Sequence, residues 1–523
     1  MAADVADRKV AVMALDVLLT GGRVIDPESG LDGVRNVGIR GGTVAYIGDD
    51  RADAARTIDV SGHVVAPGFI DMHSHAQTIS GHRLQALDGV TTSLELEGGA
   101  LPVADHYEWA ESEGRPLNFG FSAGWVYSRM HVLDGAPAVR PQDDREFRIP
   151  LGMFEQFQDG ARWRGPADGR DIGRILDLVE RQLRHGAIGI GMLAGYAPDF
   201  TAEEFGRLAD LAAETTQPMF IHARSMSAEP PGSALDAAQE IIAEAEAHSA
   251  PMHLCHMNST SGHLADSVAE SLAAARARGV PVTTEAYPYA AGSTVIGASF
   301  LAPDELRRNR MTPSSITYLP TGERVASEER LVEIRANDPG GLCVLESFDL
   351  CDPADKAMLL RAQTVPDAAI ASDAMPLTFF GTESQRHAAE CAATGDVWPL
   401  PPGLIAHPRS TGCFARALSW LVRDTGVLTL PEAIRRCTLI PAQILEEAAP
   451  AMRAKGRLRV GADADLTVFD PATVAARGDY TSLRPSTGFR HVFVGGTPVV
   501  ADGELDAAAF PGKAVRGAGA RAA

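Results

Sequence analysis

Several features that mark whole classes of protein are scarce or missing in this chain. No uninterrupted apolar run approaches the roughly 18 residues that a membrane-spanning helix needs. The 6 cysteines form no Cys-x-x-Cys pair, and the amino terminus lacks a basic region followed by an apolar stretch and a small-residue cleavage site. We therefore expect a soluble protein with reduced thiols, without a membrane partner, in the cytoplasm.

Positive charge is also scarce. The formal net charge is −21, from 68 acidic against 47 basic residues, and no stretch is rich in lysine and arginine. Such a chain repels polyanions, so we do not expect nucleic acid as a partner. We expect a small-molecule substrate. The composition does not indicate an oligomeric state. Lysine occurs only at Lys9, Lys356, Lys455 and Lys513, and all other basic residues are arginine.

The order of sequence patterns predicts an α/β protein with a (β/α)₈ barrel of the TIM type. Residues 1–66 contain short strands broken by glycine, and strand patterns return in residues 451–523, so both ends together predict a small β-sandwich. Between them, in residues 67–450, short apolar strands alternate with alanine-rich helical patterns. We predict an insertion at about 290–346, over the barrel mouth, and a frayed tail after Pro511.

Histidine and aspartate follow several of the predicted barrel strands. His73 and His75 close the apolar run that begins at Val64, and they share one face because side chains alternate along a strand. His222, His256 and Asp373 each close a later apolar strand. Each residue alone has an ordinary explanation in packing or turn formation. Together, at the carboxyl ends of strands in one barrel, they compose the site of a zinc hydrolase.

Longer motifs around these residues resemble the amidohydrolase superfamily and, within it, the N-acyl-D-amino-acid deacylases. The similarity extends from about Asp16 to Phe469. The motifs that carry it are Val65-Ala-Pro-Gly-Phe-Ile-Asp-Met-His-Ser-His75, Tyr287-Pro-Tyr289 with Ser293, His407-Pro-Arg-Ser-Thr-Gly, Leu430-Pro-Glu-Ala-Ile and residues 456–470. The run from Gly81 to Glu97 is similar to the N-acyl-D-glutamate deacylase branch of the family.

The resemblance implies a role for each strand-end residue. His73 and His75 with Asp373 would hold one metal ion, and His222 and His256 would hold a second. Asp373 would take a proton from the attacking water and pass it to the departing amine. His253 lies three residues before His256, hence on the opposite face of an extended strand, and is expected to pack or to support a ligand.

Two departures from the family pattern concern the ligand that bridges the metal ions. Many superfamily members use a carbamylated lysine, but none of the four lysines closes a barrel strand. Deacylases of this family typically have a cysteine after the second strand, where this chain has Glu95, Glu97 and Gly98. We prefer Glu97 over Glu95 as the bridging ligand because Glu97 lies nearer the carboxyl end of the strand. An ungapped comparison, however, places Gly98 at the position of the family's cysteine. We expect one or two Zn²⁺ ions. The alternative is Mn²⁺ or another divalent ion, because a carboxylate in place of a thiolate makes a harder site, which favours manganese or a fuller pair of metal ions over a single zinc.

Four residues are candidates for contacting the substrate. Where the family tends to have a lysine two residues after the sixth-strand histidine, this chain has Asn258, a donor without charge. Arg224 lies two residues beyond His222 and either clamps the substrate carboxylate or forms a salt bridge within the barrel. Tyr287 and Ser293 offer hydroxyl groups.

The resulting hypothesis is a metal-dependent hydrolase that cleaves the amide bond of N-acyl-D-amino acids. Its alternatives are a cyclic-amide hydrolase or a deaminase of the same superfamily, and a metal-free relative that serves as a scaffold. Cyclic-amide hydrolases resemble the lysine-bridged pattern, and deaminases tend to carry His-x-x-Glu after the fifth strand, where this chain has Ser225. Neither pattern is present.

Overall fold

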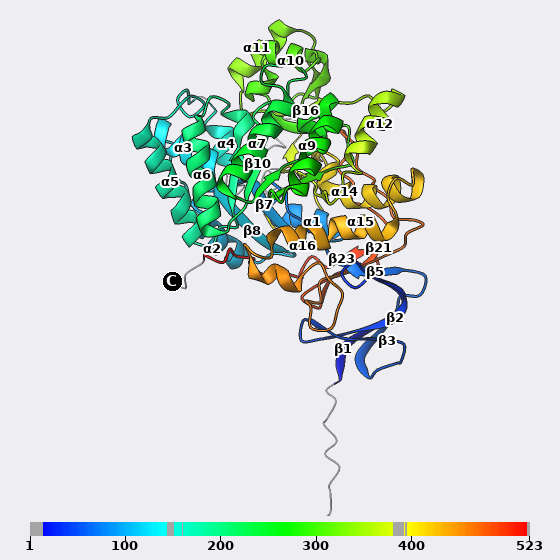
Figure 1. Ribbon diagram of the computed structural model, residues 1–523. Coiled ribbons are helices and arrows are strands. Elements are labelled where there is room, and N and C mark those ends of the chain that lie inside the picture. Colours follow the sequence, from blue (N-terminus) through cyan, green and yellow to red (C-terminus); the bar gives the residue numbers. More distant parts are fainter. Residues whose placement is uncertain (1–13, 144–150, 159, 380–391, 393–394, 520–523) are drawn as a thin grey trace, which may run out of the picture.

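A parallel β-barrel surrounded by helices forms the body of the molecule (Figure 1). The computed structural model describes residues 14–143, 151–158, 160–379, 392 and 395–519. Eight parallel strands lie in the order β17-β12-β11-β10-β9-β8-β7-β6. These strands are β6 (Phe69–Asp71), β7 (Val90–Ala100), β8 (Asn118–Gly124), β9 (Ile190–Leu193), β10 (Met219–His222), β11 (Met252–Leu254), β12 (Val282–Ala286) and β17 (Ala369–Ile370).

The first and last barrel strands meet through a buried carboxylate. Asp71, at the end of β6, accepts hydrogen bonds from the backbone N–H of Ser372, at 2.9 Å, and from the Ser372 hydroxyl. The backbone N–H of His75 donates to the Ala374 carbonyl at 2.8 Å. These bonds bring the segments after β6 and β17 together, so residues more than 290 apart in sequence become neighbours. The predicted barrel is confirmed.

Helices cover the outside of the barrel and follow the predicted strand–helix alternation. They are α1 (Ile79–Ala86), α2 (Val103–Glu113), α3 (Trp125–Asp134), α5 (Gly169–Arg184), α6 (Ala202–Thr215), α7 (Ala234–His248), α9 (Ala265–Ala277), α12 (Pro353–Ala362), α15 (Leu430–Cys437) and α16 (Leu439–Leu445). Polar residues cap several of them. Before α7, for example, Ser233 and Asp236 form a capping box, each side chain bonding the backbone N–H of the other. The caps explain why these helices begin where they do.

Strands from both ends of the chain form a separate β-domain below the barrel (Figure 1). Its nine-stranded sheet has the order β23-β22-β21-β20-β5-β1-β2-β3, with β4 paired to β1. The members are β1 (Leu15–Asp26), β2 (Leu31–Arg40), β3 (Thr43–Gly48), β4 (Ala54–Asp59), β5 (Val64–Pro67), β20 (Leu466–Phe469), β21 (Phe489–Val494), β22 (Thr497–Ala501) and β23 (Glu504–Leu505). Val44 of β3 and Phe493 of β21 share one hydrophobic core, so the sheet folds over itself. The predicted joining of the termini is confirmed, whereas the exact domain boundaries stay predictions.

Residues 291–346 form a further unit above the barrel, near the top of Figure 1. Its four strands have the order β13-β16-β14-β15. They are β13 (Ala291–Val295), β14 (Ile316–Tyr318), β15 (Glu323–Arg324) and β16 (Leu342–Glu346), joined by helices α10 (Pro303–Arg308) and α11 (Glu328–Asn337). Three further helices of the described chain are α4 (Leu151–Gln156), α8 (Met257–Thr260) and α14 (Arg409–Arg416).

The prediction of a frayed tail was wrong for the described part of it. The backbone N–H of Phe119 donates to the Lys513 carbonyl at 3.1 Å, and that of Val515 donates to the Phe119 carbonyl at 2.7 Å. The tail therefore pairs with the edge of β8, which gains backbone hydrogen bonds that composition alone does not signal. Residues 1–13 and 520–523 of the predicted terminal segments lie outside the described residues.

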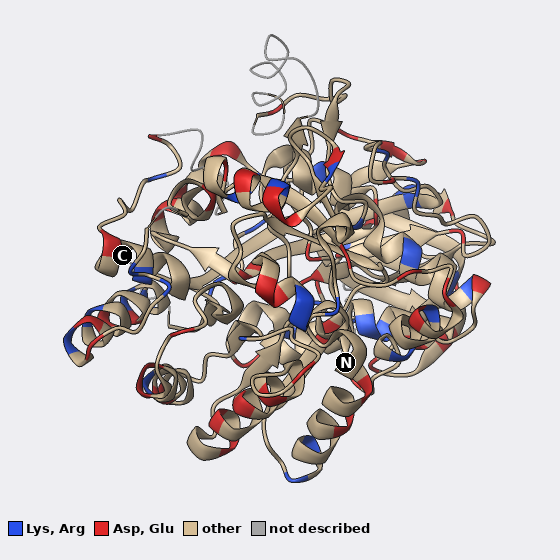
Figure 2. Cartoon of the chain, turned by 90° about the horizontal axis from the view of Figure 1, so that it is seen from above, with Lys and Arg blue, Asp and Glu red and all other residues tan. Residues whose placement is uncertain are grey.

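Charged side chains are mixed over the outer helices. Figure 2 shows Lys and Arg interspersed with Asp and Glu along these helices. Many are paired, for example Arg184 with Glu180 within α5. In the described part of the chain, no helix is long and apolar enough to cross a membrane.

Candidate metal centre

Side chains from five barrel strands converge at the carboxyl end of the barrel. His73 and His75 follow β6, Glu97 lies near the end of β7, and His222 is the last residue of β10. His256 and Asp373 follow β11 and β17, both with positive φ angles, 29° and 51°. Non-glycine residues rarely adopt this conformation, and when they do it is often at a functional site. All six side chains are buried.

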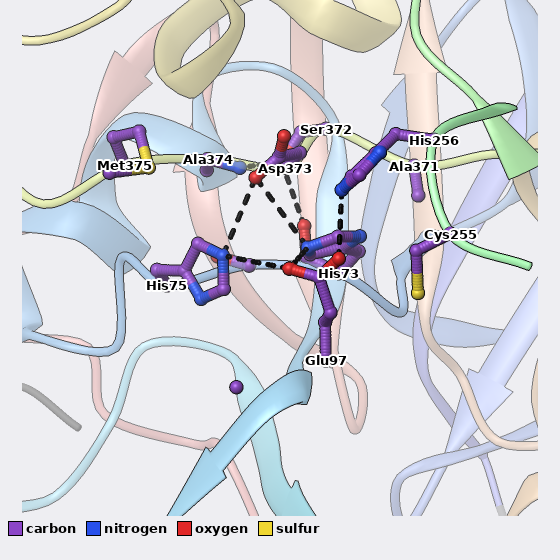
Figure 3. Close-up of polar contacts among 12 residues, drawn as sticks. His73, His75, Glu97, Cys255, His256, Ala371, Ser372, Asp373, Ala374 and Met375 are labelled. Atoms are coloured by element: carbon purple, nitrogen blue, oxygen red, sulfur yellow. Dashed lines mark hydrogen bonds and ion pairs between the residues drawn. The ribbon is translucent and has the colours of Figure 1, made fainter. Parts of the chain in front are cut away.

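The first cluster contains His73, His75, Asp373 and one oxygen of Glu97 (Figure 3); we call it the His73 position. Asp373 Oδ1 lies 3.5 Å from His73 Nε2 and 3.4 Å from His75 Nε2. Glu97 Oε2 lies 3.1 and 3.8 Å from the same two nitrogens. The two nitrogens and two oxygens thus face one another around a single point.

The second cluster contains His222, His256 and the other oxygen of Glu97; we call it the His222 position. Glu97 Oε1 lies 2.8 Å from His256 Nε2. In each position, three ligand atoms from His and Glu lie within 4.8 Å of one another. Nitrogen and carboxylate ligands at this spacing, all buried, fit two divalent ions bridged by the carboxylate of Glu97.

The structure also separates the roles of Glu95 and Glu97. Glu95 Oε2 lies 2.7 Å from His75 Nδ1, the ring nitrogen that faces away from Asp373. Its other oxygen accepts the backbone N–H of Gly98 at 3.1 Å and of Gly99 at 3.3 Å. Glu95 therefore supports His75 from behind, and only Glu97 faces both clusters. Gly98, the position given by the ungapped comparison, has no side chain that could bind a metal ion.

Electrostatics differ between the two clusters when no ion is bound. Burial opposes a charge on His73, but the carboxylates of Glu97 and Glu285 outweigh it and raise the pKa of His73 well above its usual value. The pKa of His75 rises to about 9, against the effect of burial, because Glu95 and Asp373 are close. Burial dominates at His222 and lowers its pKa to about 4. The His73 position is thus the more anionic of the two.

Arg409, a residue that the sequence analysis did not single out, completes the surroundings of Asp373. Its Nη2 lies 2.7 Å from Asp373 Oδ2, and its Nε donates to the Asp373 carbonyl at 2.5 Å. Burial raises the pKa of Asp373, but Arg409 and His73 outweigh it and lower the pKa to about 2. Asp373 is therefore ionised at neutral pH. Arg409 is fully buried, and its Nη1 has no hydrogen-bond partner among the described residues.

A cavity opens beside both clusters, with an empty volume of about 640 Å³ that includes its open mouth. Tyr287 and Ser293, both predicted to contact substrate, border it. The Ser293 hydroxyl donates to the Cys343 carbonyl at 3.0 Å. The remaining wall is largely apolar and includes Leu151, Phe154, Leu193, Met226, Val295, Phe300, Leu345 and Met375.

Two predicted substrate contacts are placed elsewhere. Arg224 forms a two-point ion pair with Glu240, at 2.9 and 2.7 Å, and its Nη1 donates to backbone carbonyls of Pro198 and Phe200. Each of its three guanidinium nitrogens donates a hydrogen bond, so Arg224 forms the salt bridge that the sequence analysis gave as the alternative to a carboxylate clamp. Asn258 does not border the cavity, and its side-chain oxygen accepts the backbone N–H of Tyr287 at 3.1 Å. It holds Tyr287 from behind.

Sequence reasoning missed Glu285 as well as Arg409. Glu285 lies on β12, and its Oε1 is 2.5 Å from His73 Nδ1 while its Oε2 is 3.2 Å from His253 Nε2. The expectation that His253 supports a ligand matches this placement. A signal for Glu285 existed in the sequence, since it stands two residues before the Tyr-Pro-Tyr motif, directly after the β-branched, strand-like run Val282-Thr-Thr, and a carboxylate is rarely buried unless it is paired.

Two curated relatives and a solved structure are similar to this chain over more than nine-tenths of its length. An N-acyl-D-glutamate deacylase of Alcaligenes xylosoxydans xylosoxydans is 29% identical over 506 residues, covering 93% of each chain. A D-aminoacylase of the same organism is 27% identical, covering 92% of this chain and 94% of its own. The crystal structure of N-acyl-D-glutamate deacylase from Bordetella bronchiseptica, complexed with zinc and a phosphonate mimic of the tetrahedral intermediate, has a TM-score of 0.72 at 23% identity, covering 96% of this chain and all of its own.

A model of the amidohydrolase family matches residues 172–500, more than half of the chain and most of the barrel. The match includes His222, His256 and Asp373, and the strands that carry His73, His75 and Glu97 complete the same barrel. On this match, the chain belongs to the amidohydrolase family.

Proposed function

We propose that this protein is a metal-dependent hydrolase that cleaves N-acyl-D-amino acids to a carboxylate and a free D-amino acid. The observation that carries the proposal is the bridging arrangement of Glu97, whose two oxygens each face a separate histidine pair next to the ionised Asp373. Full-length similarity to a D-aminoacylase and an N-acyl-D-glutamate deacylase supports the substrate class.

The proposed metal ligands are His73, His75, Glu97, His222, His256 and Asp373. Their donor set suits zinc, which the Bordetella bronchiseptica deacylase binds, and the extra carboxylate also suits Mn²⁺. Ions held here supply Lewis-acid activation of water and of the scissile carbonyl. The centre would contain one or two ions.

Asp373 is the group that moves the proton. It is ionised at neutral pH, as its pKa of about 2 requires, so it accepts the proton of the attacking water. It then delivers this proton to the amide nitrogen as the C–N bond breaks, and the amine leaves. Arg409 fixes the carboxylate through Oδ2, which leaves Oδ1 directed between His73 and His75.

Arg409 is also the cation that we assign to the substrate carboxylate. A methyl group placed on Gly292, which borders the cavity, would lie 3.7 Å from Arg409 Nη1 and 3.3 Å from the Tyr287 hydroxyl. The unpartnered Nη1 and this hydroxyl therefore lie beside the same part of the cavity wall. A guanidinium donor and a phenol together suit a carboxylate. This assignment replaces Arg224.

The alternatives are less well supported by the residues present. A lysine-bridged cyclic-amide hydrolase lacks its bridging residue here, because none of the described lysines closes a barrel strand. Lys356 lies on helix α12, Lys455 is paired with Asp463 and Asp465, and Lys513 lies in the tail beside β8. A metal-free scaffold would not retain six converging ligands.

The free, buried thiols of Cys255, Cys343, Cys413 and Cys437 support the proposed cytoplasmic location.

The proposal is tested by supplying the zinc-loaded full-length protein with matched D and L pairs of N-acetyl amino acids. We expect release of free amino acid from members of the D series, at least tenfold faster than from their L partners. Equal or faster turnover of the L series would reject the D preference. No release from any member of either series would reject amide hydrolysis of this substrate class.

A further inference from the structure

The connection between strands β20 and β21 of the β-domain forms a hairpin, residues 475–487, which we call the β-domain hairpin. Two backbone hydrogen bonds between Ala475 and Thr487, both at 3.0 Å, close its neck. At its tip, the side chain of Asp479 accepts the backbone N–H of Thr481 at 2.8 Å. The hairpin is therefore held by its own hydrogen bonds and extends beyond the paired part of the two strands.

Ser486 of the β-domain hairpin binds the start of helix α14, which carries Arg409 as its first residue. Its hydroxyl oxygen lies 2.8 Å from the Thr411 carbonyl and 2.7 Å from Asp88 Oδ1. Asp88 Oδ2 in turn accepts the backbone N–H of Phe414 at 2.8 Å. Ser486 and Asp88 are both buried, so these bonds tie the first turns of α14 to the β-domain.

Glycines let the β-domain hairpin and helix α14 approach each other closely. A methyl group placed on Gly478 would lie 2.7 Å from Thr411 Oγ1, and one on Gly412 would lie 2.7 Å from the Cβ of Ala476. A side chain at either position would push the hairpin away from the helix, and glycine avoids this. The helix and the hairpin are therefore in direct backbone contact two to three residues after Arg409.

Tyr480, near the tip of the β-domain hairpin, contacts the chain two residues before Arg409. Its ring meets the ring of His407 edge to face, with centroids 5.1 Å apart at an interplanar angle of 86°. His407 Nδ1 accepts the backbone N–H of Arg409 at 3.1 Å. His407 is buried, whereas Tyr480 is 40% exposed, so replacing Tyr480 removes this ring contact and leaves the core in place.

Arg409 is thus held from both directions along the chain, through His407 before it and Thr411 after it. Its free Nη1 is the donor that we assign to the substrate carboxylate. A binding group keeps its productive geometry only if surrounding residues hold it within about 0.5 Å. A displacement of about 1 Å can cost about 100-fold in rate. The contacts of the hairpin are placed to prevent such a displacement.

We propose that the β-domain hairpin positions Arg409 for the substrate carboxylate, with Tyr480 and Ser486 as positioning residues that act through His407 and Thr411. This inference rests on the proposed assignment of Arg409 to that carboxylate. It gives the β-domain a part in substrate recognition, although no residue of the hairpin, all of which is described, borders the cavity beside the metal centre.

The proposal is tested on the zinc-loaded full-length protein with two probes that resist hydrolysis, N-methanesulfonyl-D-leucine and its primary amide. The ratio of their affinities, measured by isothermal titration calorimetry, isolates the contribution of the carboxylate. We expect wild type to favour the acid roughly 10- to 150-fold. Tyr480→Ala and Ser486→Ala should each reduce this preference roughly 3- to 30-fold.

Two variants serve as controls on the hairpin itself. Tyr480→Phe keeps the ring that contacts His407 and should show the wild-type preference. Thr487→Ala changes an exposed side chain next to Ser486 and should also leave the preference unchanged. An unchanged preference in both Tyr480→Ala and Ser486→Ala would overturn the proposal. An equal loss of affinity for acid and amide would overturn it as well, because that is the effect of a role in stability alone.

The variant Arg409→Met shows whether the hairpin acts through Arg409. In this background, Tyr480→Ala should cause no further change in the acid-to-amide ratio, because the donor that the hairpin positions is absent. A further reduction of the same size as in wild type would overturn the proposal. Circular dichroism, thermal unfolding and zinc content are measured on each variant. If Ser486→Ala does not fold, Tyr480→Ala and Tyr480→Phe decide the outcome.

Binding of these probes is read without turnover, so the two proposals fail separately. A wild-type preference for the acid that survives Tyr480→Ala would reject the role of the hairpin and leave deacylation intact. Equal binding of acid and amide by wild type would reject the assignment of Arg409 and, with it, the role of the hairpin. The expected pattern of ratios in a protein that releases no amino acid would reject deacylation alone.

Discussion

The proposed contact between Arg409 and the substrate carboxylate can be measured as a contribution to kcat/KM. Arg409 is fully buried and holds Asp373 with two of its donors, while Nη1 has no partner and lies beside the Tyr287 hydroxyl. If Nη1 binds the carboxylate of the substrate, the bond is charge-assisted and worth about 1.5–3 kcal/mol. That corresponds to roughly 10- to 150-fold in kcat/KM.

Replacing Arg409 by methionine also disturbs Asp373, so the comparison needs two substrates. We would measure kcat/KM of wild type and Arg409→Met for an N-acyl-D-amino acid and for its primary amide, which lacks the negative charge. The damage to Asp373 lowers both values and cancels in the ratio. We predict that the wild-type preference for the acid over the amide shrinks roughly 10- to 150-fold in the variant.

Arg224→Met is the matched control. Arg224 also lies near the carboxyl end of the barrel, but its donors bind Glu240 and backbone carbonyls. The acid-to-amide ratio should therefore stay at the wild-type value in this variant. An Arg409→Met enzyme that loses the same factor on both substrates would refute the assignment of the carboxylate to Arg409.

Three further predictions follow from the site and the core. Asp373→Asn should lower kcat by roughly 10²–10⁴-fold, because the amide side chain cannot accept and return the proton. Steady-state kinetics, with zinc content measured on the same sample, would show this loss, and an undiminished kcat would contradict the prediction. The apolar cavity wall predicts faster turnover of N-acyl-D-leucine or N-acyl-D-phenylalanine than of N-acyl-D-glutamate, and a reversed order of kcat/KM would contradict it. Burial lowers the pKa of His106 to about 4 from 6.5, so the folded state binds fewer protons than the unfolded state between these values, and stability is lost as pH falls through that window. Urea unfolding should show a loss of about 3 kcal/mol from this group between pH 6.5 and 4, and His106→Asn should show a shallower decline; identical pH profiles would contradict this account.

The barrel and the convergence of its strand-end residues were predictable because their signals are local. Alternation places His73 and His75 on one face, and the carboxyl ends of parallel strands meet at one end of a barrel. His222, His256 and Asp373 follow from the same rule. Glu95 and Glu97 share a strand face, so alternation alone does not separate a ligand from the residue that supports its neighbour.

The supporting contacts were not predictable in the same way because they join distant segments. Glu285 reaches His73 across 212 residues, and Asp71 reaches Ser372 across 301. Arg224 illustrates a different limit. Strand β10 ends at His222, so alternation no longer applies two residues later, and the side chain turns to Glu240 instead of the cavity. The tail after Pro511 pairs with β8 through backbone groups, which its Ala/Gly/Arg composition does not reveal.

Metal-dependent release of a free D-amino acid tests the central claim most directly. The full-length protein would be assayed on one N-acyl-D-amino acid as loaded with zinc, after removal of both ions by a strong chelator, and after zinc is restored, with metal content measured on each sample. We predict that turnover disappears with the metal and returns when zinc is restored. Undiminished turnover by the metal-stripped protein, or no turnover at full zinc content across the D series, would contradict the account.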